Sequence, residues 1–204
     1  MSEYYDEKYG SDELFWGKYP TSIARILFQK HMPRQGQTLL DIGFGEGRDS
    51  IFFAQNGYQV SGFDLSLEGV NRALAWAREL GLSIDFFQAD INEYRLKNSF
   101  DLIFSSSALH YIPLYLREEI ILNYKSHTNP GGIHAFTVPI NKPFLPKNPE
   151  DDRLEQDWRS GEILSHYHDW KIDYFSEQIL DDPSGYPFTV NRLIAIEPSA
   201  PQTT

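Results

Sequence analysis

The feature that most constrains the fold is a regular alternation of short apolar runs with helix-length stretches through the middle of the chain. Five buried strands are predicted, over residues 38–42, 58–63, 84–89, 100–105 and 133–138. Helices are predicted around them, over residues 21–31, 48–56, 66–80 and 114–127. This spacing requires an α/β fold, with a mostly parallel, doubly wound sheet that is covered by helices on both faces.

The C-terminal part of the chain departs from this alternation. Residues 139–160 contain four prolines and mixed charges, which predicts a loop that could act as a lid. A short helix is predicted over residues 162–167, and strands are predicted over 170–175 and 188–196. The turn cluster at 181–185 joins these two strands and favours an antiparallel hairpin. We therefore expect a parallel sheet that ends in a hairpin.

Length and charge limit the organisation and the partners of the chain. Its 204 residues fit one domain, since a domain holds roughly 150 residues. The 18 basic and 29 acidic residues give a net charge of −11, which argues against nucleic acids and anionic membranes as partners. No apolar run approaches the ~20 residues of a membrane span and the polar start does not resemble a signal peptide, so a cytoplasmic protein is expected. The absence of cysteine excludes disulfides and thiolate chemistry.

The first 35 residues are rich in aromatic side chains. These side chains are Tyr4, Tyr5, Tyr9, Phe15, Trp16 and Tyr19. A disordered leader would be poor in such residues, so the segment is expected to pack on the body of the domain. Residues 1–35 and the 139–160 loop are the candidates for closing over a site.

A glycine-rich turn follows the first predicted strand, in the order Asp41-Ile42-Gly43-Phe44-Gly45-Glu46-Gly47-Arg48. Ligands of open α/β sheets bind at such strand ends, where glycine lets them approach the backbone. The chain lacks the Gly-Lys-Ser/Thr of a phosphate-binding loop, and Arg48 stands where a dinucleotide fingerprint needs glycine. The carboxylate of Asp41 suits a ligand with ammonium and sulfonium groups better than a pyrophosphate.

Two further acidic residues follow the next two strands. Asp64 can accept both hydroxyl groups of a ribose, as the acid after a dinucleotide fingerprint does. Asp90 can accept a hydrogen bond from an exocyclic amine, with Leu65 and Ile91 packing on the base, or it can simply turn the chain. Because parallel strands end at the same edge of a sheet, Asp41, Asp64 and Asp90 are predicted to line one crevice.

The stretches that carry these residues resemble a known family. LLDIGFGEGRDS, GFDLS, QADI, FDLIFSSSALHYI and NPGGIHAFTV are similar to the class I S-adenosylmethionine-dependent methyltransferases over about residues 36–140. YYDEKYGSDELFWGKYP, RDSIFFAQNGYQV and HYHDWKIDYF resemble, more narrowly, the tellurite-resistance methyltransferases. The resemblance implies a seven-stranded sheet in the order 3-2-1-4-5-7-6 with the last strand antiparallel.

The resemblance also implies which residues hold S-adenosylmethionine. The glycine turn would carry the methionine moiety, with Phe44 where the family commonly has cysteine. Asp64 would bind the ribose, and Asp90 with Ile91 would bind the adenine edge. The full implied set is Lys8, Tyr9, Asp41, Gly43, Phe44, Gly45, Gly47, Arg48, Asp64, Leu65, Asp90, Ile91, Ser105 and Ser106. Tellurite-resistance relatives carry Glu-Leu-His after the sixth strand, whereas residues 178–180 here are Gln-Ile-Leu, which leaves the acceptor open.

His110 and Tyr111 follow the fourth strand and are the candidate catalytic residues. A base is needed only if the acceptor loses a proton, so His110 could serve as a base, orient a group or pack. His166 and His168 are two residues apart and do not share a helix face, so no metal site is predicted.

The sequence therefore predicts an enzyme that transfers a methyl group from S-adenosylmethionine to a small-molecule acceptor and leaves S-adenosylhomocysteine. The acceptor could be an oxyanion such as tellurite or selenite, or a thiol. The protein is expected to act as a monomer or a homodimer. Two alternatives are a protein that binds the cofactor without turnover, as a sensor or partner subunit, and a nicotinamide-dependent oxidoreductase.

Overall fold

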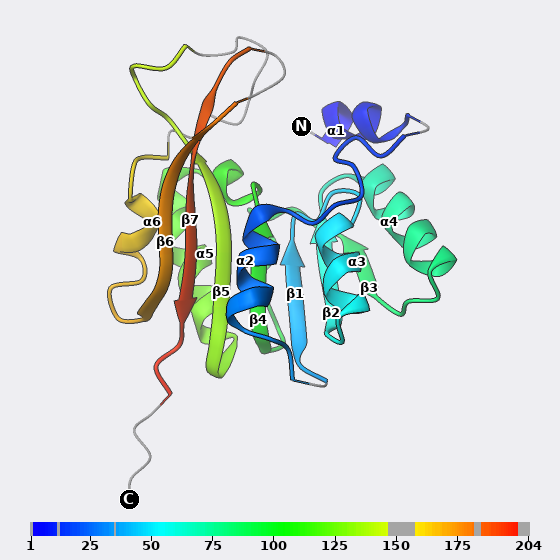
Figure 1. The fold of residues 1–204 in the computed structure, drawn as a ribbon, viewed down its shortest axis with the longest axis horizontal. Coiled ribbons are helices and arrows are strands. Elements are labelled where there is room, and N and C mark those ends of the chain that lie inside the picture. Colours follow the sequence, from blue (N-terminus) through cyan, green and yellow to red (C-terminus); the bar gives the residue numbers. More distant parts are fainter. Residues whose placement is uncertain (1, 12, 35, 147–157, 182–184, 200–204) are drawn as a thin grey trace, which may run out of the picture.

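A single seven-stranded sheet runs through the molecule in the order β3-β2-β1-β4-β5-β7-β6 (Figure 1). The computed structural model describes residues 2–11, 13–34, 36–146, 158–181 and 185–199. Strand β7 is antiparallel to both of its neighbours, whereas all other neighbouring strands are parallel. The predicted strand order and the antiparallel C-terminal hairpin are confirmed.

The strands are β1 (Thr38–Ile42), β2 (Gln59–Asp64), β3 (Asp85–Gln88), β4 (Phe100–Ser106), β5 (Thr128–Ile140), β6 (Lys171–Leu180) and β7 (Phe188–Ile196). The helices are α1 (Ser2–Tyr9), α2 (Ser22–Lys30), α3 (Arg48–Gln55), α4 (Leu67–Glu79), the 3-10 helix η1 (Leu109–Tyr111), α5 (Leu114–Ser126) and α6 (Glu162–Ser165). Among the described residues, no helix is both long and apolar enough to cross a membrane.

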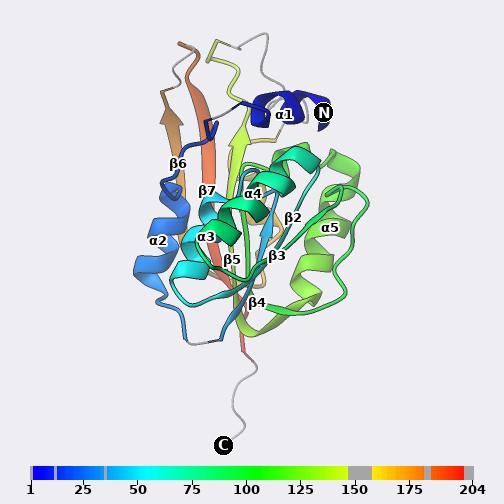
Figure 2. The same cartoon turned by 90° about the vertical axis from the view of Figure 1, so that its right-hand side faces the viewer.

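Helices cover both faces of the sheet (Figures 1 and 2). Helices α2, α3 and α4 lie on one face, where Leu27 of α2 and Phe53 of α3 are fully buried against the strands. Helices α5 and α6 lie on the other face, where Tyr124 and Ile163 are buried. Burial of both faces explains why the central strands are continuous apolar runs.

Strand β1 lies at the point where the order of the strands reverses. Its neighbours are β2 on one side and β4 on the other, so the chain winds outward from β1 in both directions. The carboxyl ends of β1 and β4 therefore form the switch point at which doubly wound sheets bind ligands.

Strand β5 begins earlier than its sequence suggests. The strand was expected from Ile133, but it starts at Thr128. It contains an irregularity, where the register against β4 shifts between Phe100 and Leu102. Gly131 has a φ of +74° there, a conformation that glycine adopts without strain.

The C-terminal hairpin is longer than predicted at its turn end. Strand β6 continues to Leu180 rather than residue 175, and the hairpin projects beyond the sheet at the carboxyl edge of the parallel strands (Figure 1). The predicted 139–160 loop overlaps the end of β5 at Ile140, and its residues 147–157 lie outside the described residues. At the two ends of this loop the Asn141 N–H donates to the Trp158 carbonyl at 2.9 Å.

The N-terminal segment contains a helix that its sequence did not predict. Helix α1 lies across the carboxyl edge of the sheet and packs against α4 (Figures 1 and 2). The sequence of α1 is polar and has no apolar stripe. Such a stripe is not needed here, because α1 packs against the end of α4 and not against a broad face of the sheet.

Candidate active site

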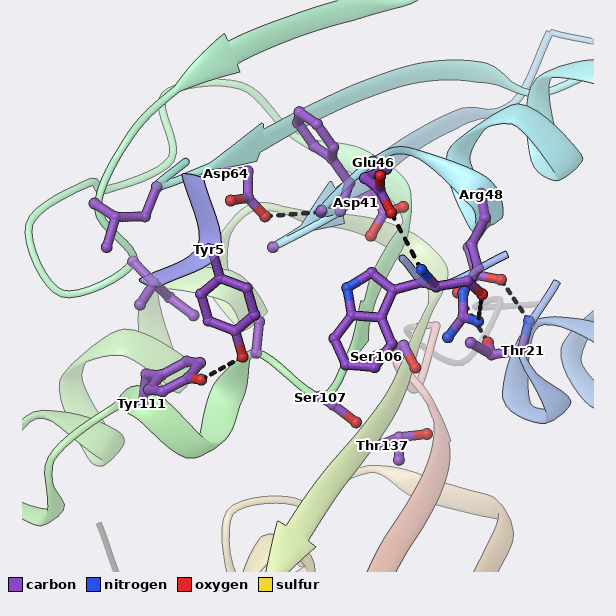
Figure 3. A pocket seen from close by; sticks show the side chains of 18 of the residues that line it. Tyr5, Thr21, Asp41, Glu46, Arg48, Asp64, Ser106, Ser107, Tyr111 and Thr137 are labelled. Carbon is purple, nitrogen blue, oxygen red and sulfur yellow. Dashed lines mark hydrogen bonds between the residues drawn. The ribbon is translucent and has the colours of Figure 1, made fainter. Parts of the chain in front are cut away.

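A cavity of about 440 Å³ opens at the carboxyl ends of β1, β2 and β4 (Figure 3). The glycine turn, the segments after β2, β3 and β4, and the N-terminal segment bound it. The carboxyl end of β5 and the amino end of β7 complete its lining. Its size lies within the range of small-molecule sites, roughly 300–1,000 Å³. It is therefore the candidate active site.

The glycine turn brings its backbone to the edge of this cavity. Gly43 has a φ of +68°, and a Cβ placed there would lie 2.2 Å from the Cβ of Ala108. Gly45 has a φ of +60°, and its Cβ would lie 2.8 Å from the hydroxyl of Tyr9. Glycine is thus required at both positions by backbone conformation and by space.

Five acidic residues line one side of the cavity, which we call the acidic wall. They are Asp41, Glu46, Asp49, Asp64 and Asp90. The sequence had predicted Asp41, Asp64 and Asp90 and had missed the other two. Glu46 lies in the glycine turn and Asp49 lies just after it. Only this position in the sequence could have indicated that they line the cavity.

The chain itself holds the Asp64 and Asp41 carboxylates in place. Asp64 accepts hydrogen bonds from the backbone N–H of Gly45 at 2.8 Å and of Ser66 at 2.9 Å. Asp41 is 2% exposed and accepts one from the Ser50 hydroxyl at 2.6 Å. Burial raises the pKa of both carboxyl groups, although hydrogen bonds oppose the shift. A cation in the cavity would favour their ionised forms.

Glu46 and Asp49 tie the N-terminal segment to the turn. The Trp16 N–H donates to the Glu46 carboxylate at 3.2 Å, and the Arg72 guanidinium lies 3.4 Å from its other oxygen. Asp49 accepts from the Thr21 N–H at 2.7 Å and from its hydroxyl at 2.9 Å. Burial raises the pKa of both acids.

Asp90 begins the segment that follows β3. Its carboxylate accepts a hydrogen bond from the Asn92 N–H at 2.8 Å, so it does turn the chain locally. It also lines the cavity beside Ile91, with Leu65 nearby on the same wall. A carboxylate oxygen accepts more than one hydrogen bond, so the turn and a ligand contact are compatible.

Aromatic residues of the N-terminal segment cover the cavity. The hydroxyl of Tyr5 lies 2.6 Å from that of Tyr111, which joins α1 to η1 across the opening (Figure 3). The Trp16 indole N–H donates to the Tyr9 hydroxyl at 2.9 Å, and Arg48 donates to the Trp16 carbonyl at 2.6 Å. Tyr9 is almost fully buried, which raises the pKa of its hydroxyl.

The side of the cavity opposite the acidic wall is formed by β4, β5, β6 and β7. We call this side the hairpin wall. Its residues are Ser106, Thr137, Leu180, Phe188, Val190 and Arg192. Thr137 of β5 and Arg192 of β7 pair directly across the antiparallel ladder, so their side chains lie on the same face of the sheet. The sequence had indicated only Ser106 among these residues.

Most of the predicted site residues line this one cavity. They are Tyr9, Asp41, Gly43, Phe44, Gly45, Arg48, Asp64, Leu65, Asp90, Ile91, Ser106 and Tyr111. Four others lie near the cavity but do not line it: Lys8, Gly47, Ser105 and His110.

The surroundings of these four residues explain their positions. The Lys8 ammonium lies over the ring of Phe15, 5.7 Å from its centroid. Gly47 precedes α3 with a φ of +88°, and the Ser105 hydroxyl donates to the Ile42 carbonyl at 2.9 Å. His110 is buried behind Tyr111, with ring centroids 3.9 Å apart. Their functional roles stay predictions.

The described residues contain no cluster of three or more histidine, cysteine or acidic side chains arranged to hold a metal ion. His166 contacts Glu118, 3.2 Å away, and His168 contacts the Ser165 carbonyl at 3.3 Å. The two histidines therefore have separate surface partners.

Comparisons with known proteins find similarity to methyltransferases. Residues 39–132 match a family described as methyltransferase domain. "Hemagglutinin 1" of Eikenella corrodens is 27% identical over 141 residues, which are 69% of this chain and 46% of that protein. The "Probable S-adenosyl-L-methionine-dependent methyltransferase TehB" of Haemophilus influenzae is 24% identical over 141 residues, 69% of this chain and 48% of that protein. This chain thus spans about half the length of these relatives.

Two further similarities bear on fold and substrate. The crystal structure of TehB from Haemophilus influenzae superposes with a TM-score of 0.77 at 21% identity, over 96% of this chain and 66% of that one. The trans-aconitate 2-methyltransferase of Deinococcus radiodurans is 34% identical over 103 residues, 50% of this chain and 38% of that protein. Residues 39–132 thus match the methyltransferase-domain family, and the sequence and strand order of the chain support a class I S-adenosylmethionine-dependent methyltransferase.

Proposed function

We propose that this chain transfers a methyl group from S-adenosylmethionine to a small-molecule acceptor. The observation that carries the proposal is the convergence of three strand-end acids, Asp41, Asp64 and Asp90, on one cavity beside a glycine turn. The match of residues 39–132 to the methyltransferase-domain family supports the same reaction.

The acidic wall fits the cofactor in charge and in hydrogen-bonding capacity. Each oxygen of Asp64 accepts one backbone N–H and has a second lone pair left for a ribose hydroxyl. Asp90 offers an acceptor for an amine, and Leu65 and Ile91 offer apolar surface for a base. The buried Asp41 carboxylate suits the ammonium group of the amino-acid end, since opposite charges attract strongly where water is excluded.

The residues of this chain are proposed to act by positioning and by excluding water. The cofactor supplies a methyl group on a sulfonium, so that an acceptor lone pair bonds to the methyl carbon while the carbon–sulfur bonding pair stays on sulfur. The two walls hold the reactants in line at a short distance, a mode of catalysis that does not require a strong base. The aromatic cover formed by Tyr5, Tyr9 and Trp16 limits the access of water.

His110 is proposed as a positioning residue rather than a base. Its ring stacks against Tyr111, whose hydroxyl lies 2.6 Å from that of Tyr5 at the mouth of the cavity. It can therefore fix the orientation of Tyr111 without touching a ligand in the cavity.

The N-terminal segment is proposed to close over the bound ligands. Besides the buried ring of Tyr9, it has several polar links to the body of the domain: Asp6 accepts from the Ser66 hydroxyl at 2.5 Å, and Arg72 contacts the Tyr9 and Ser11 carbonyls. Polar links of this kind can release and re-form during turnover, whereas an apolar interface of the same size would hold the segment shut.

The acceptor is proposed to be a small molecule, with oxyanions such as tellurite or selenite, thiols and carboxylates as candidates. A chain with a net charge of −11 is a poor match for nucleic acids, and a cavity of about 440 Å³ holds a small acceptor besides the methyl donor. The resemblance of the sequence to the tellurite-resistance methyltransferases favours an oxyanion, and the similarity to the trans-aconitate enzyme favours a carboxylate.

Product formation tests the proposal. The protein would be incubated with S-adenosylmethionine and a panel of thiols, oxyanions, small amines and carboxylates, and S-adenosylhomocysteine would be quantified by mass spectrometry. We expect product with at least one acceptor, and much less product with the Asp64→Ala variant when S-adenosylmethionine is below saturation. Micromolar binding of S-adenosylmethionine without product from any acceptor would instead indicate a protein that binds the cofactor without turnover.

A further inference from the structure

We propose that Arg192 forms an anion-binding subsite in the hairpin wall, so that the acceptor is a small anion carrying a carboxylate or an oxyanion group. This inference rests on the proposed function, because it assigns the substrate class of the same cavity. The inference rests on two neighbouring side chains, the buried guanidinium of Arg192 on β7 and the buried hydroxyl of Thr137 on β5. Among the described residues, the Arg192 Nε and the Thr137 hydroxyl have no hydrogen-bond partner.

In the part of the chain that the structure describes, the buried Arg192 side chain has no counter-ion. It is 6% exposed and lines the cavity, its Nη1 donates to the Gln178 amide oxygen at 2.5 Å, and its Nε has no hydrogen-bond partner. Among the residues that the structure describes, no carboxylate lies within ion-pair distance of it. Buried arginines are almost always paired, because an uncompensated charge is costly away from water. Burial accordingly lowers the pKa of Arg192.

A second donor without a partner lies beside this guanidinium. Thr137 pairs with Arg192 across the β5–β7 ladder, is 5% exposed, and its hydroxyl has no hydrogen-bond partner. Figure 3 shows Thr137 with Ser107 on the side of the pocket away from Asp64. Two adjacent buried donors that both lack acceptors indicate that the acceptor atoms come from a ligand.

The chemistry of this wall selects an anion over a neutral or cationic molecule. A guanidinium offers a planar fork of N–H donors that matches a carboxylate or an oxyanion. The neighbouring side chains of Leu180, Phe188 and Val190 are apolar and strengthen the attraction by excluding water. The acidic wall repels the same anion. The cationic methyl donor is therefore favoured at the acidic wall, and the anionic acceptor is favoured at the hairpin wall.

Calorimetry on the full chain saturated with S-adenosylhomocysteine tests the subsite. The probes are selenite for the oxyanions, trans-aconitate for the carboxylates and 2-mercaptoethanol as a neutral thiol. The variants are Arg192→Met, which keeps a long side chain without the charge, and Arg192→Lys, which restores the charge. Arg78→Met is the matched control, since Arg78 is exposed on α4 and its loss changes the net charge equally.

We expect at least one anion to bind wild type and Arg78→Met with the same Kd. Arg192→Met should weaken that binding at least tenfold, and Arg192→Lys should recover part of it, while the Kd of S-adenosylhomocysteine stays within twofold. The anion that binds identifies the acceptor as an oxyanion or a carboxylate. Thr137→Val should weaken the same anion several-fold, which provides a second test if Arg192→Met does not fold.

Two outcomes would overturn the subsite while leaving the proposed function intact. One is that neither anion binds the wild-type complex, and the other is that Arg192→Met binds the anion as wild type does. Failure of wild type to bind S-adenosylhomocysteine at all would instead overturn the proposed function. A melting temperature of Arg192→Met at or above the wild-type value supports the subsite, since removal of an unpaired buried charge should not destabilise the fold.

Discussion

The two walls of the cavity differ in how their polar groups are satisfied. In the acidic wall, Asp41, Asp49 and Asp64 each accept hydrogen bonds from groups of this chain. In the hairpin wall, the Nε of Arg192 and the hydroxyl of Thr137 have no partner among the described residues. Groups of this chain hold these three carboxylates in place, whereas the hairpin wall leaves two donors for a ligand.

The walls also differ in charge. Burial raises the pKa of four carboxyl groups in the acidic wall, and a cation that binds beside them would favour their ionised forms. The hairpin wall has a buried guanidinium and no acidic residue among its described members. A cationic donor and an anionic acceptor would each supply the charge that one wall lacks.

Removal of the Asp64 carboxylate should have the largest effect on the acidic wall. Asp64→Ala is expected to weaken S-adenosylhomocysteine binding by about 2 kcal/mol or more, roughly 30-fold, because hydrogen bonds to a charged group are lost. Isothermal calorimetry measures the change, with Asp85→Ala on the exposed start of β3 as the matched control. An unchanged affinity would remove Asp64 from the ribose site, and with it the assignment of this wall to the cofactor.

Deletion of residues 1–19 should have the next largest effect, because it removes the cover that joins the two walls. We expect binding of S-adenosylhomocysteine or turnover to fall by about tenfold while the circular dichroism of the sheet is retained, since the segment contributes to the site rather than to the apolar core. The control is Tyr19→Ala in the full chain, because Tyr19 is 87% exposed. A truncated protein with full activity would show that the segment is not a lid.

The pH dependence should separate the acidic wall from ordinary surface acids. Because burial raises the pKa of Asp41 and Asp64, these carboxyl groups should take up protons at a higher pH than surface acids, and this protonation should weaken S-adenosylmethionine binding. The free protein should gain stability as the same groups are protonated, since a raised folded-state pKa favours the protonated fold. S-adenosylhomocysteine keeps the ammonium group and the ribose, so its binding should weaken on acidification as well. Affinities for both ligands that do not change as the pH is lowered would contradict the assignment of Asp41 and Asp64 to the cofactor.

Loss of the hydrogen bond that bridges the cover and η1 should have the smallest effect. Tyr5→Phe removes the 2.6 Å contact with Tyr111 and is expected to weaken S-adenosylhomocysteine binding by about 1 kcal/mol or less. Isothermal calorimetry measures this change in affinity. The control is Tyr4→Phe, because Tyr4 is a neighbouring exposed tyrosine. A loss as large as that of Asp64→Ala would mean that the cover, rather than the acidic wall, dominates binding.

The acidic wall could be predicted from sequence because its residues are set locally. Asp64 ends β2 and Asp90 follows β3, and parallel strands of a doubly wound sheet end at one edge, so both acids had to approach the glycine turn. Glu46 in the turn and Asp49 in the first turn of α3 were missed, because they hold Trp16 and Thr21 and do not lie at the end of a strand.

The hairpin wall could not be predicted in the same way. Arg192 reaches the cavity only because β7 inserts antiparallel between β5 and β6, which places it opposite Thr137. This register depends on contacts far apart in the sequence, and a shift of one residue would turn Arg192 to the other face. Helix α1 was missed for a related reason, since its polar sequence does not show a stripe of apolar residues.

A crystal structure of the protein with S-adenosylhomocysteine and the tighter-binding anion would test the central claim most directly. The account predicts the ribose at Asp64, the adenine beside Asp90, and the anion in contact with the Arg192 guanidinium, facing the sulfur across the cavity. An anion that avoids Arg192, or a sulfur atom turned away from the hairpin wall, would contradict the division of the cavity into donor and acceptor sides.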